Sequence, residues 1–473
     1  MRKGCGMMAK EILSPVHRRL LVAIALAGSF LSVLTQFLLI TAFPEIMAEF
    51  EINASQVQWL TTSFMLAIAI LIPMTAYLID KFKTRTLMIF AMLLFFAGTL
   101  LGLFSHSFEV LLVARIIQGI SSGIMMPLMQ TILFLVYPRK KRGYAMGLAG
   151  LVINVAPAIG PPISGVLINH FEWRSVFLFT LPVAAIILVF IFLFMRNVTE
   201  QRETEIDFLS IFLSTAGFGG VLYGFNVIES ETAGNVAILS ISAGLVAIIF
   251  FVVRQLRLKT PILELRVLKV PVFSLVTIIS IISFSLLISI ETILPMYVQN
   301  AQQLSPLYAG LAVAPGALTL AVMSLFAGKL YDKYGGKIIT IIGFVLLSVS
   351  TIWYYFGIET TSSFIFTSFL FMMSMAGVAL INMPIMTAGI NALPDKLIPH
   401  GTAIINTARQ FGGSLGLTFI ISFITMSASG TGTADPLNFL NGVKTAFFVA
   451  FLFSVTGLVL SLLLKRDKQS ARQ

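Results

Sequence analysis

Long apolar stretches dominate this sequence, and short charged segments separate them. Fourteen of the stretches have about 20 residues or more, which is enough for a helix to cross the hydrocarbon core of a bilayer. Charged residues make up only 11% of the chain, against about 25% in a typical soluble protein. The chain is therefore predicted to be an all-α integral membrane protein. The expected spans lie near residues 20–43, 56–79, 86–105, 109–136, 144–168, 175–195, 208–228, 236–254, 271–298, 306–328, 338–356, 363–389, 400–426 and 444–464.

The basic residues indicate how these spans are oriented. Of the 31 Lys and Arg residues, 27 fall in the two tails and in alternate loops, whereas the opposite loops hold only Arg174 and Lys444. Basic loops stay on the cytoplasmic side of a membrane, so both ends of the chain are expected in the cytoplasm. The first apolar run, 20–43, is longer than the core of a cleavable signal peptide and is expected to remain as a span.

Composition also excludes several classes of protein. The net charge of +11 lies in short clusters between apolar runs, a pattern typical of membrane orientation rather than of nucleic-acid binding. The single cysteine, Cys5, and four scattered histidines offer neither a disulfide framework nor a metal site. The sequence has no nucleotide-binding loop and no segment long enough for a soluble domain, so it predicts neither an enzyme nor a cofactor.

One charged turn occurs twice in the chain. The two copies share an aspartate and two basic residues at matching positions, which are Asp80, Lys81 and Arg85 in the first copy and Asp332, Lys333 and Lys337 in the second. Each aspartate is expected near the start of the helix that follows it, where backbone N–H groups favour an anion. Either copy alone could be a solvated cytoplasmic loop. The pair instead indicates an ancient duplication of a helical bundle.

Pairing the two copies divides the chain into two six-helix bundles. The first six spans form one half and the last six form the other, so the seventh and eighth spans are an insertion between them. The predicted segments are a cytoplasmic tail (1–19), a first bundle (20–195), a linker with two inserted spans (196–270), a second bundle (271–464) and a cytoplasmic tail (465–473).

Charged and small residues within the spans form further motifs. Arg115 lies several residues inside the fourth span, where a charge usually faces a cavity or a partner, although it could also extend to the outer membrane surface. Trp173 and Arg174 precede the sixth span, and Arg409 and Gln410 lie in the thirteenth. The fifth span carries small residues and prolines, which allow close helix packing or bend a helix. These residues are Gly147, Pro157, Gly160, Pro161 and Gly165.

With these motifs the chain resembles the major facilitator superfamily, and in particular its fourteen-helix drug:proton antiporters of the EmrB and QacA type. The resemblance extends over essentially the whole chain. It implies that the charged turns close a cytoplasmic gate and that Arg115 takes part in proton coupling. It also implies that the fifth-span motif marks an exporter rather than an uptake symporter.

One position departs from that family. Its members commonly carry an aspartate in the first span, but the corresponding stretch, Leu34–Pro44, has no carboxylate. Glu291 falls clearly within the ninth span, which is the counterpart of the first. A carboxyl group among apolar neighbours can exchange a proton near neutral pH, so Glu291 is the candidate proton carrier. Pro295 and Tyr297 indicate that the helix end is close, and Glu291 could instead contact water at the outer interface.

Four amide side chains at membrane depth are candidates for lining a substrate cavity between the two halves. They are Gln36, Asn154, Asn382 and Asn406. Hydrogen bonds between packed helices would explain each of them equally well.

The resemblance implies a proton-coupled efflux antiporter of the bacterial cytoplasmic membrane, which exports lipophilic, often cationic compounds by alternating access. Its expected partners are small lipophilic substrates, protons and the lipid bilayer, without nucleic acid, and it is expected to function as a monomer. A dedicated exporter of an endogenous lipid or metabolite would share every motif. An uptake symporter and a membrane sensor that transports nothing are the remaining alternatives.

Overall fold

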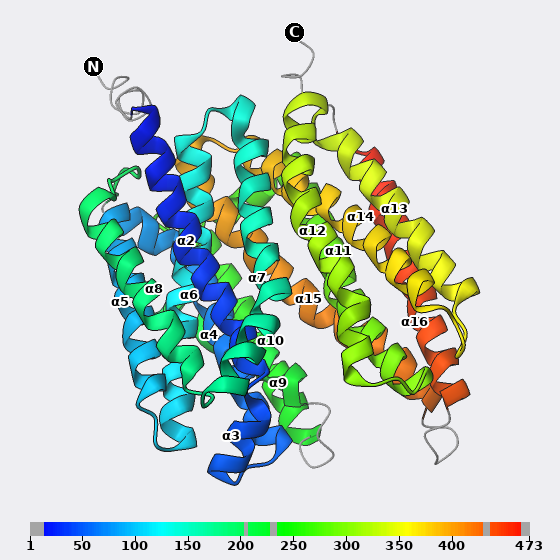
Figure 1. Cartoon of the computed structure of the whole chain (residues 1–473). Coiled ribbons are helices and arrows are strands. Elements are labelled where there is room, and N and C mark those ends of the chain that lie inside the picture. Colours follow the sequence, from blue (N-terminus) through cyan, green and yellow to red (C-terminus); the bar gives the residue numbers. More distant parts are fainter. Residues whose placement is uncertain (1–13, 203–206, 228–233, 429–435, 465–473) are drawn as a thin grey trace. The chain divides into compact units, whose positions relative to one another are not determined.

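The computed structural model describes residues 14–202, 207–227, 234–428 and 436–464. These residues form fifteen α-helices, α2 to α16, some of which are joined by short 3₁₀ or π-helical turns (Figure 1). The helices are α2 Pro15–Ile40, α3 Phe43–Phe50, α4 Ala54–Lys81, α5 Thr84–Leu103, α6 Phe108–Val136, α7 Arg142–His170, α8 Ser175–Phe194, α9 Phe208–Val227, α10 Gly234–Arg257, α11 Pro271–Met296, α12 Pro306–Tyr334, α13 Gly336–Gly357, α14 Phe364–Asn391, α15 Ile398–Ala428 and α16 Pro436–Leu462.

Thirteen helices in the described part of the chain are long and apolar enough to cross a membrane. They coincide with thirteen of the fourteen predicted spans, which confirms the all-helical class. The remaining predicted span, 400–426, forms helix α15, which is not among the thirteen. The fourteenth crossing therefore stays a prediction.

Two helices differ in their bounds from the predicted spans. The first predicted span, 20–43, is interrupted after Ile40, and the short helix α3 follows. Pro44 lies in the first turn of α3, where a backbone N–H has no intrahelical acceptor. Helix α16 begins at Pro436, so Lys444 lies within the helix and not in the preceding loop.

The chain divides into two compact units. Unit 1 comprises the residues up to Pro138, Ala156–Arg266 and Asp395–Asn406, and unit 2 comprises Arg139–Val155, Val267–Pro394 and the chain from Thr407 onward. Helix α7 therefore begins in unit 2 and ends in unit 1. Helix α15 begins in unit 1 and ends in unit 2.

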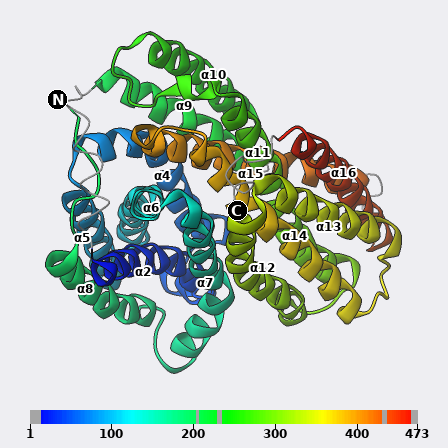
Figure 2. The same ribbon diagram turned by 90° about the horizontal axis from the view of Figure 1, so that it is seen from above.

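The helices pack in the same pattern within each unit. In unit 1, α6 packs against α2, α4 and α5, and α8 packs against α2 and α5 (Figure 2). In unit 2, α14 packs against α11, α12 and α13, and α16 packs against α11 and α13. The helices α2, α4, α5, α6 and α8 of unit 1 thus correspond, in this order, to α11, α12, α13, α14 and α16 of unit 2. The duplication indicated by the two charged turns thus extends to the packing.

The inserted helices α9 and α10 form a closely packed hairpin on unit 1, and α9 also contacts α4. The two backbones approach closely at Gly244, where a Cβ atom would lie 2.7 Å from the backbone nitrogen of Val221. Large apolar side chains such as Phe212, Leu239 and Phe250 are exposed on the hairpin. An exposed apolar surface of this kind is expected where a helix faces lipid.

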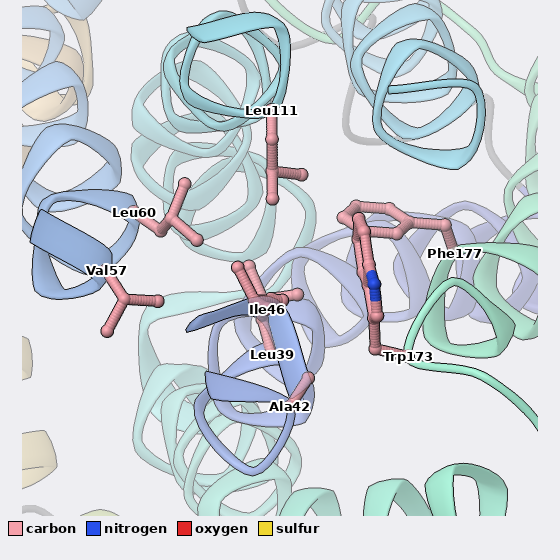
Figure 3. Packing of buried hydrophobic residues seen from close by; sticks show 8 residues of the cluster. All are labelled: Leu39, Ala42, Ile46, Val57, Leu60, Leu111, Trp173 and Phe177. Atoms are coloured by element: carbon pink, nitrogen blue, oxygen red, sulfur yellow. The ribbon is translucent and has the colours of Figure 1, made fainter. Parts of the chain in front are cut away.

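Buried apolar side chains join helices at one end of unit 1 (Figure 3). The cluster consists of Leu39, Ala42, Ile46, Val57, Leu60, Leu111, Trp173 and Phe177. The indole nitrogen of Trp173 donates to Glu49 of α3, and Arg174 donates to both carboxylate oxygens of Glu49 at 2.6 and 2.9 Å. Arg174 also donates to the carbonyl oxygen of Ser105 at 2.7 Å. The Trp-Arg pair of the sequence therefore fastens α3 to the start of α8.

We predict that Glu49→Gln lowers the melting temperature by about 1–3 °C at pH 7. The hydrogen bond from Arg174 is the main cause that lowers the pKa of Glu49 below its usual 4.5. Because the pKa of Glu49 is lower in the folded than in the unfolded protein, its ionised carboxylate stabilises the fold at any pH above the unfolded-state pKa. This contribution is lost as the pH falls through the folded-state pKa. The difference from the wild type should thus narrow below about pH 4.5 in thermal unfolding followed by fluorescence. Glu51→Gln, at an exposed position nearby, is the control, and an equal loss in both variants would contradict the assignment.

Candidate functional site

Asp332, the aspartate of the second charged turn, binds the beginning of α7 within unit 2. Its carboxylate accepts N–H bonds from Gly143 at 2.9 Å and from Tyr144 at 2.8 Å. Such N–H groups in a first turn lack an intrahelical acceptor, and the helix dipole favours an anion there. The sequence predicted that the aspartate would lie at the start of the helix that follows it. It lies instead in the last turn of α12, because α12 extends to Tyr334 and only Gly335, with a φ of 80°, precedes α13.

Two glycines of the sequence motifs bring α7 and α12 into backbone contact beside this aspartate. A Cβ atom on Gly328 would overlap the carbonyl oxygen of Gly143 and would lie 2.8 Å from the Cα of Gly147. A Cβ atom on Gly147 would lie 2.7 Å from the carbonyl oxygen of Ser324. A larger residue does not fit at either position without moving a backbone. Gly147 of the fifth-span motif and Gly328 of the charged turn therefore belong to one packing seam.

Asp80, the aspartate of the first charged turn, has different partners in unit 1. It is 5% exposed in the last turn of α4, and its carboxylate accepts from His400 Nε2 at 3.1 Å and from Arg202 at 3.4 Å. It does not cap the following helix, which begins at Thr84 without a side-chain cap. His400 is one of the four scattered histidines, and its pairing with Asp80 was not predicted from the sequence. No local pattern could have found it, because the two residues are 320 positions apart.

Basic residues at matching positions of the two turns bind the ends of helices. Arg85 donates to the carbonyl oxygen of Phe192 in the last turn of α8, at 2.6 Å. Lys337 donates to the carbonyl oxygen of Leu462 at the end of α16, at 2.6 Å. These carbonyl groups carry the negative end of a helix dipole and attract cations. Each turn thereby holds the last helix of the corresponding bundle.

The other basic residues of the two turns make local contacts. Lys81 donates to the hydroxyl oxygen of Tyr77 at 2.8 Å, one turn back in α4. The Lys333 ammonium lies 5.0 Å from the ring centre of Tyr334, which is its neighbour in α12. Both of these contacts stay within one helix.

Arg115 is enclosed in unit 1, with an exposed fraction of 0%. Its Nε donates to the carbonyl oxygen of Leu60 at 3.3 Å, its Nη1 donates to Gln118 at 2.9 Å, and its guanidinium lies 4.3 Å from the ring centre of Phe64. Gln118 in turn donates to Thr99 at 2.9 Å. The side chain therefore turns inward, and does not extend to a membrane surface. Among the described residues, no carboxylate forms an ion pair with it.

Glu291 lies in α11 of unit 2, less than two turns before the π-helical turn Tyr297–Ala301. Its side chain is half-buried. Within the described ranges no hydrogen bond or ion pair engages it. This position is compatible with both interpretations of the sequence, as a proton carrier or as a group near the helix end.

Two of the four amide side chains connect helices directly. Asn154 of α7 donates to the Ser324 hydroxyl of α12 at 3.1 Å. Asn406 of α15 donates to Gln130 of α6 at 2.6 Å, and both side chains are buried. These bonds favour the alternative that the amides stabilise packing seams.

Asn382 connects three helices of unit 2. Its side-chain oxygen accepts from Ser283 of α11 at 3.0 Å, and its carbonyl oxygen accepts from Arg409 of α15 at 2.6 Å. Arg409 is 7% exposed, so its guanidinium also lies inside the unit. Gln36 is half-buried on α2, and the described side chains provide no hydrogen bond to it. Of the four amides, Gln36 is therefore the one that no described residue engages in a hydrogen bond.

The rest of the fifth-span motif lies in the part of α7 that belongs to unit 1. Pro157 and Pro161 lie within one continuous helix. A Cβ atom on Gly160 would lie 2.8 Å from the Cβ of Phe37 on α2, whereas one on Gly165 would meet no atom within 4 Å. Packing against α2 thus explains Gly160. No described residue lies close enough to explain Gly165 in this way.

We predict that Asp332→Ala accelerates amide hydrogen exchange at Gly143 and Tyr144 by about 5- to 10-fold, which corresponds to the roughly 1 kcal/mol of a typical N-cap. The substitution removes both acceptors from the first turn of α7. Asp332→Asn keeps one oxygen acceptor and should give a smaller increase. Lys333→Ala, at the exposed neighbouring position, is the control. Unchanged exchange in Asp332→Ala would show that other groups protect these amides.

Comparison with known proteins places these features in a family. Residues 25–417 match the Major Facilitator Superfamily. The chain is 46% identical over 461 residues to the uncharacterized MFS-type transporter YcnB of Bacillus subtilis (97% of this chain and 98% of YcnB). It is 36% identical to the lincomycin resistance protein LmrB of the same organism (95% and 96% covered) and 25% identical to the multidrug export protein EmrB of Haemophilus influenzae (94% and 88%).

A solved structure shows the same fold. The human organic anion transporter MFSD10 (TETRAN) superposes with a TM-score of 0.67 over 95% of this chain and 100% of that chain, at 13% sequence identity. The bacterial relatives indicate the cytoplasmic membrane for this multi-pass protein, and the family consists of transporters rather than enzymes. The chain therefore belongs to the major facilitator superfamily, close to the drug:proton antiporters of the LmrB and EmrB type.

Proposed function

We propose that this transporter is a proton-coupled efflux antiporter, which exports lipophilic, often cationic compounds by alternating access. The observation that carries the proposal is the near full-length similarity to a lincomycin resistance protein, at 36% identity. The buried Arg115 and the close-packed Gly147 support it, because both belong to motifs that the resemblance assigns to drug:proton antiporters. In this proposal both termini are cytoplasmic, α15 is the fourteenth crossing and the monomer is sufficient.

Glu291 is the proposed proton carrier, because its place within its helix differs from that of the other acidic residues in the spans. Asp80 and Asp332 lie in the last turns of their helices and are bound to other groups. Glu109 lies in the first turn of α6. Among the described spans, Glu291 is the acidic residue that lies in neither the first nor the last turn of its helix, and no described side chain forms a hydrogen bond or ion pair with its carboxyl group. It is therefore available to a proton or to a cationic substrate.

Unit 1 has no equivalent group at the position where the family commonly has an aspartate. In the register that ends at Pro44, this position is Thr35. Its hydroxyl donates to the carbonyl oxygen of Leu31 at 2.8 Å, and the residue is fully buried. A hydroxyl group does not ionise near neutral pH, so Thr35 cannot replace a carboxylate in proton exchange.

In the proposed cycle, ionised Glu291 binds a cationic compound, and a proton entering from outside neutralises the carboxylate and releases the compound. Arg115 tunes this exchange through its charge. No carboxylate among the described residues forms an ion pair with it. The substrate thus leaves as the proton arrives, which is the exchange that an antiporter requires.

We predict that Glu291→Gln abolishes efflux driven by a proton gradient, because glutamine can neither release a proton nor carry a negative charge. Inverted membrane vesicles with an imposed pH gradient provide the measurement, with a fluorescent cationic dye and lincomycin as two separate substrates. Glu109→Gln is the matched control, since it removes a carboxylate from the end of another span. Transport at the wild-type rate in Glu291→Gln would contradict the role of this residue.

The same vesicles separate the alternative functions. A dedicated exporter of an endogenous lipid or metabolite would move neither substrate but would export compounds from a panel of cell metabolites. An uptake symporter would move its substrate in the opposite direction along the proton gradient. A sensor would transport nothing after reconstitution of the purified protein into liposomes.

A further inference from the structure

The inserted hairpin is anchored at its base by a hydrogen-bonded ion pair. Asp207, directly before α9, accepts two hydrogen bonds from Arg254 of α10, at 2.8 and 2.9 Å. Ser210 donates to the same carboxylate at 2.6 Å. The hydrogen bonds from Arg254 are the main reason that the pKa of Asp207 is lowered to about 2. The pair therefore stays ionised at neutral pH and joins the cytoplasmic ends of the two inserted helices in the proposed orientation.

The anchor continues into the linker that follows α10. Gln255, which is 1% exposed, donates to Ser210 at 2.6 Å, and its side-chain oxygen accepts the N–H of Leu263 at 3.1 Å. The next N–H in this linker, that of Glu264, donates to Nδ1 of His400 at 3.1 Å. Ile262 and Leu263 are buried, so this linker is packed into unit 1. It connects the hairpin to the third residue of α15.

His400 connects this linker to Asp80 of the first charged turn. Because Nδ1 of His400 accepts a hydrogen bond from Glu264, Nε2 carries the proton and donates to Asp80 at 3.1 Å. His400 is 4% exposed and Asp80 is 5% exposed. A buried carboxylate of this kind needs donors from the protein, since water does not reach it.

The linker that precedes α9 binds the same aspartate. The backbone N–H of Arg202 donates to the carbonyl oxygen of Asp80 at 2.8 Å, and its guanidinium donates to the Asp80 carboxylate at 3.4 Å. The guanidinium also donates to the carbonyl oxygen of Lys396 at 3.1 Å, in the turn directly before α15. The linker before α9 therefore contacts Asp80 and the turn before α15, and the linker after α10 contacts His400 in the first turn of α15.

The two halves differ at the start of the helix that faces each aspartate. The second residue of α7 is Gly143, whose N–H binds Asp332. The second residue of α15 is Pro399, which has no N–H to donate. The corresponding aspartate, Asp80, therefore depends on a histidine ring and on an arginine supplied by the inserted segment.

We propose that the inserted hairpin and its two linkers act as a latch, which holds the first turn of α15 against the end of α4 through Asp80, Arg202, Gln255, Glu264 and His400. Helix α15 continues from unit 1 into unit 2, so the latch acts on a helix that belongs to both units. The role in the transport cycle rests on the proposed function. The latch itself is defined by contacts that can be measured without transport.

If these contacts form one latch, the two linkers should lose their hydrogen bonds together in local unfolding. The amides of Arg202, Leu263 and Glu264 lie outside the helices, and their acceptors belong to the latch. Single-residue hydrogen exchange by mass spectrometry therefore reports on each linker separately. It is measured on the purified protein in lipid nanodiscs, without substrate and without a proton gradient.

Arg202→Gln should accelerate exchange at Leu263 and Glu264 by at least about fivefold, although neither amide touches Arg202. The Arg202 side chain is 38% exposed, so this variant should fold. Arg196→Gln is the matched control, because it makes the same change at an exposed position of the same linker. The reciprocal variant, His400→Ala, should accelerate exchange at Arg202. His400→Gln should restore protection, because glutamine offers both a donor and an acceptor.

Acceleration confined to the linker that carries the substitution would overturn the proposal, since the two linkers would then be independent. Unchanged exchange in both Arg202→Gln and His400→Ala would overturn it as well. If His400→Ala does not fold, Arg202→Gln still decides between coupled and independent linkers. These outcomes do not depend on whether Glu291→Gln exports a dye, so the failure of either proposal is recognised separately.

Discussion

Polar groups inside a membrane-spanning helical bundle must find their partners within the protein, because lipid offers no hydrogen bonds. This constraint determines the arrangement of both units. Buried Arg115 is bound by a carbonyl group, an amide and an aromatic ring, and Asn382 joins three helices through its side chain and its backbone. The two aspartates of the charged turns have the most demanding requirement, because each is a carboxylate at a helix end that is packed against other helices.

The two halves satisfy this requirement in different ways. In unit 2, Asp332 binds the free N–H groups of a helix start, and the glycines next to it allow the backbones to touch. In unit 1, Pro399 removes the equivalent N–H group, and Asp80 is bound by side chains from segments far away in the sequence. The second arrangement includes Arg202 of the linker before the inserted helices, and the first includes no residue of the insertion. The insertion is thus part of the architecture around the first charged turn, although it has no counterpart in the internal repeat.

The sequence predicted the helical spans well, because the length of an apolar run is a local property. It predicted fewer of the hydrogen-bond partners of the charged side chains. For Asp332 the type of partner, a helix N-terminus, was correct, but tertiary packing selected α7 in place of the next helix. For Arg115 the sequence left two directions open, and the choice depends on Leu60 and Phe64, which belong to another helix. His400 had no recognisable motif, and only the fold brings it to Asp80. The length of α15 is clear from the sequence, whereas its crossing of the membrane stays a prediction.

The most direct test of proton-coupled transport through Glu291 is to count the protons that leave the purified protein when a substrate binds. If a cationic substrate and a proton compete for this carboxyl group, binding must release protons, by thermodynamic linkage. A pH indicator in weakly buffered detergent solution should therefore show acidification when the substrate is added to the wild type and none when it is added to Glu291→Gln. Equal proton release from the two proteins, at equal substrate occupancy, would show that another group carries the proton.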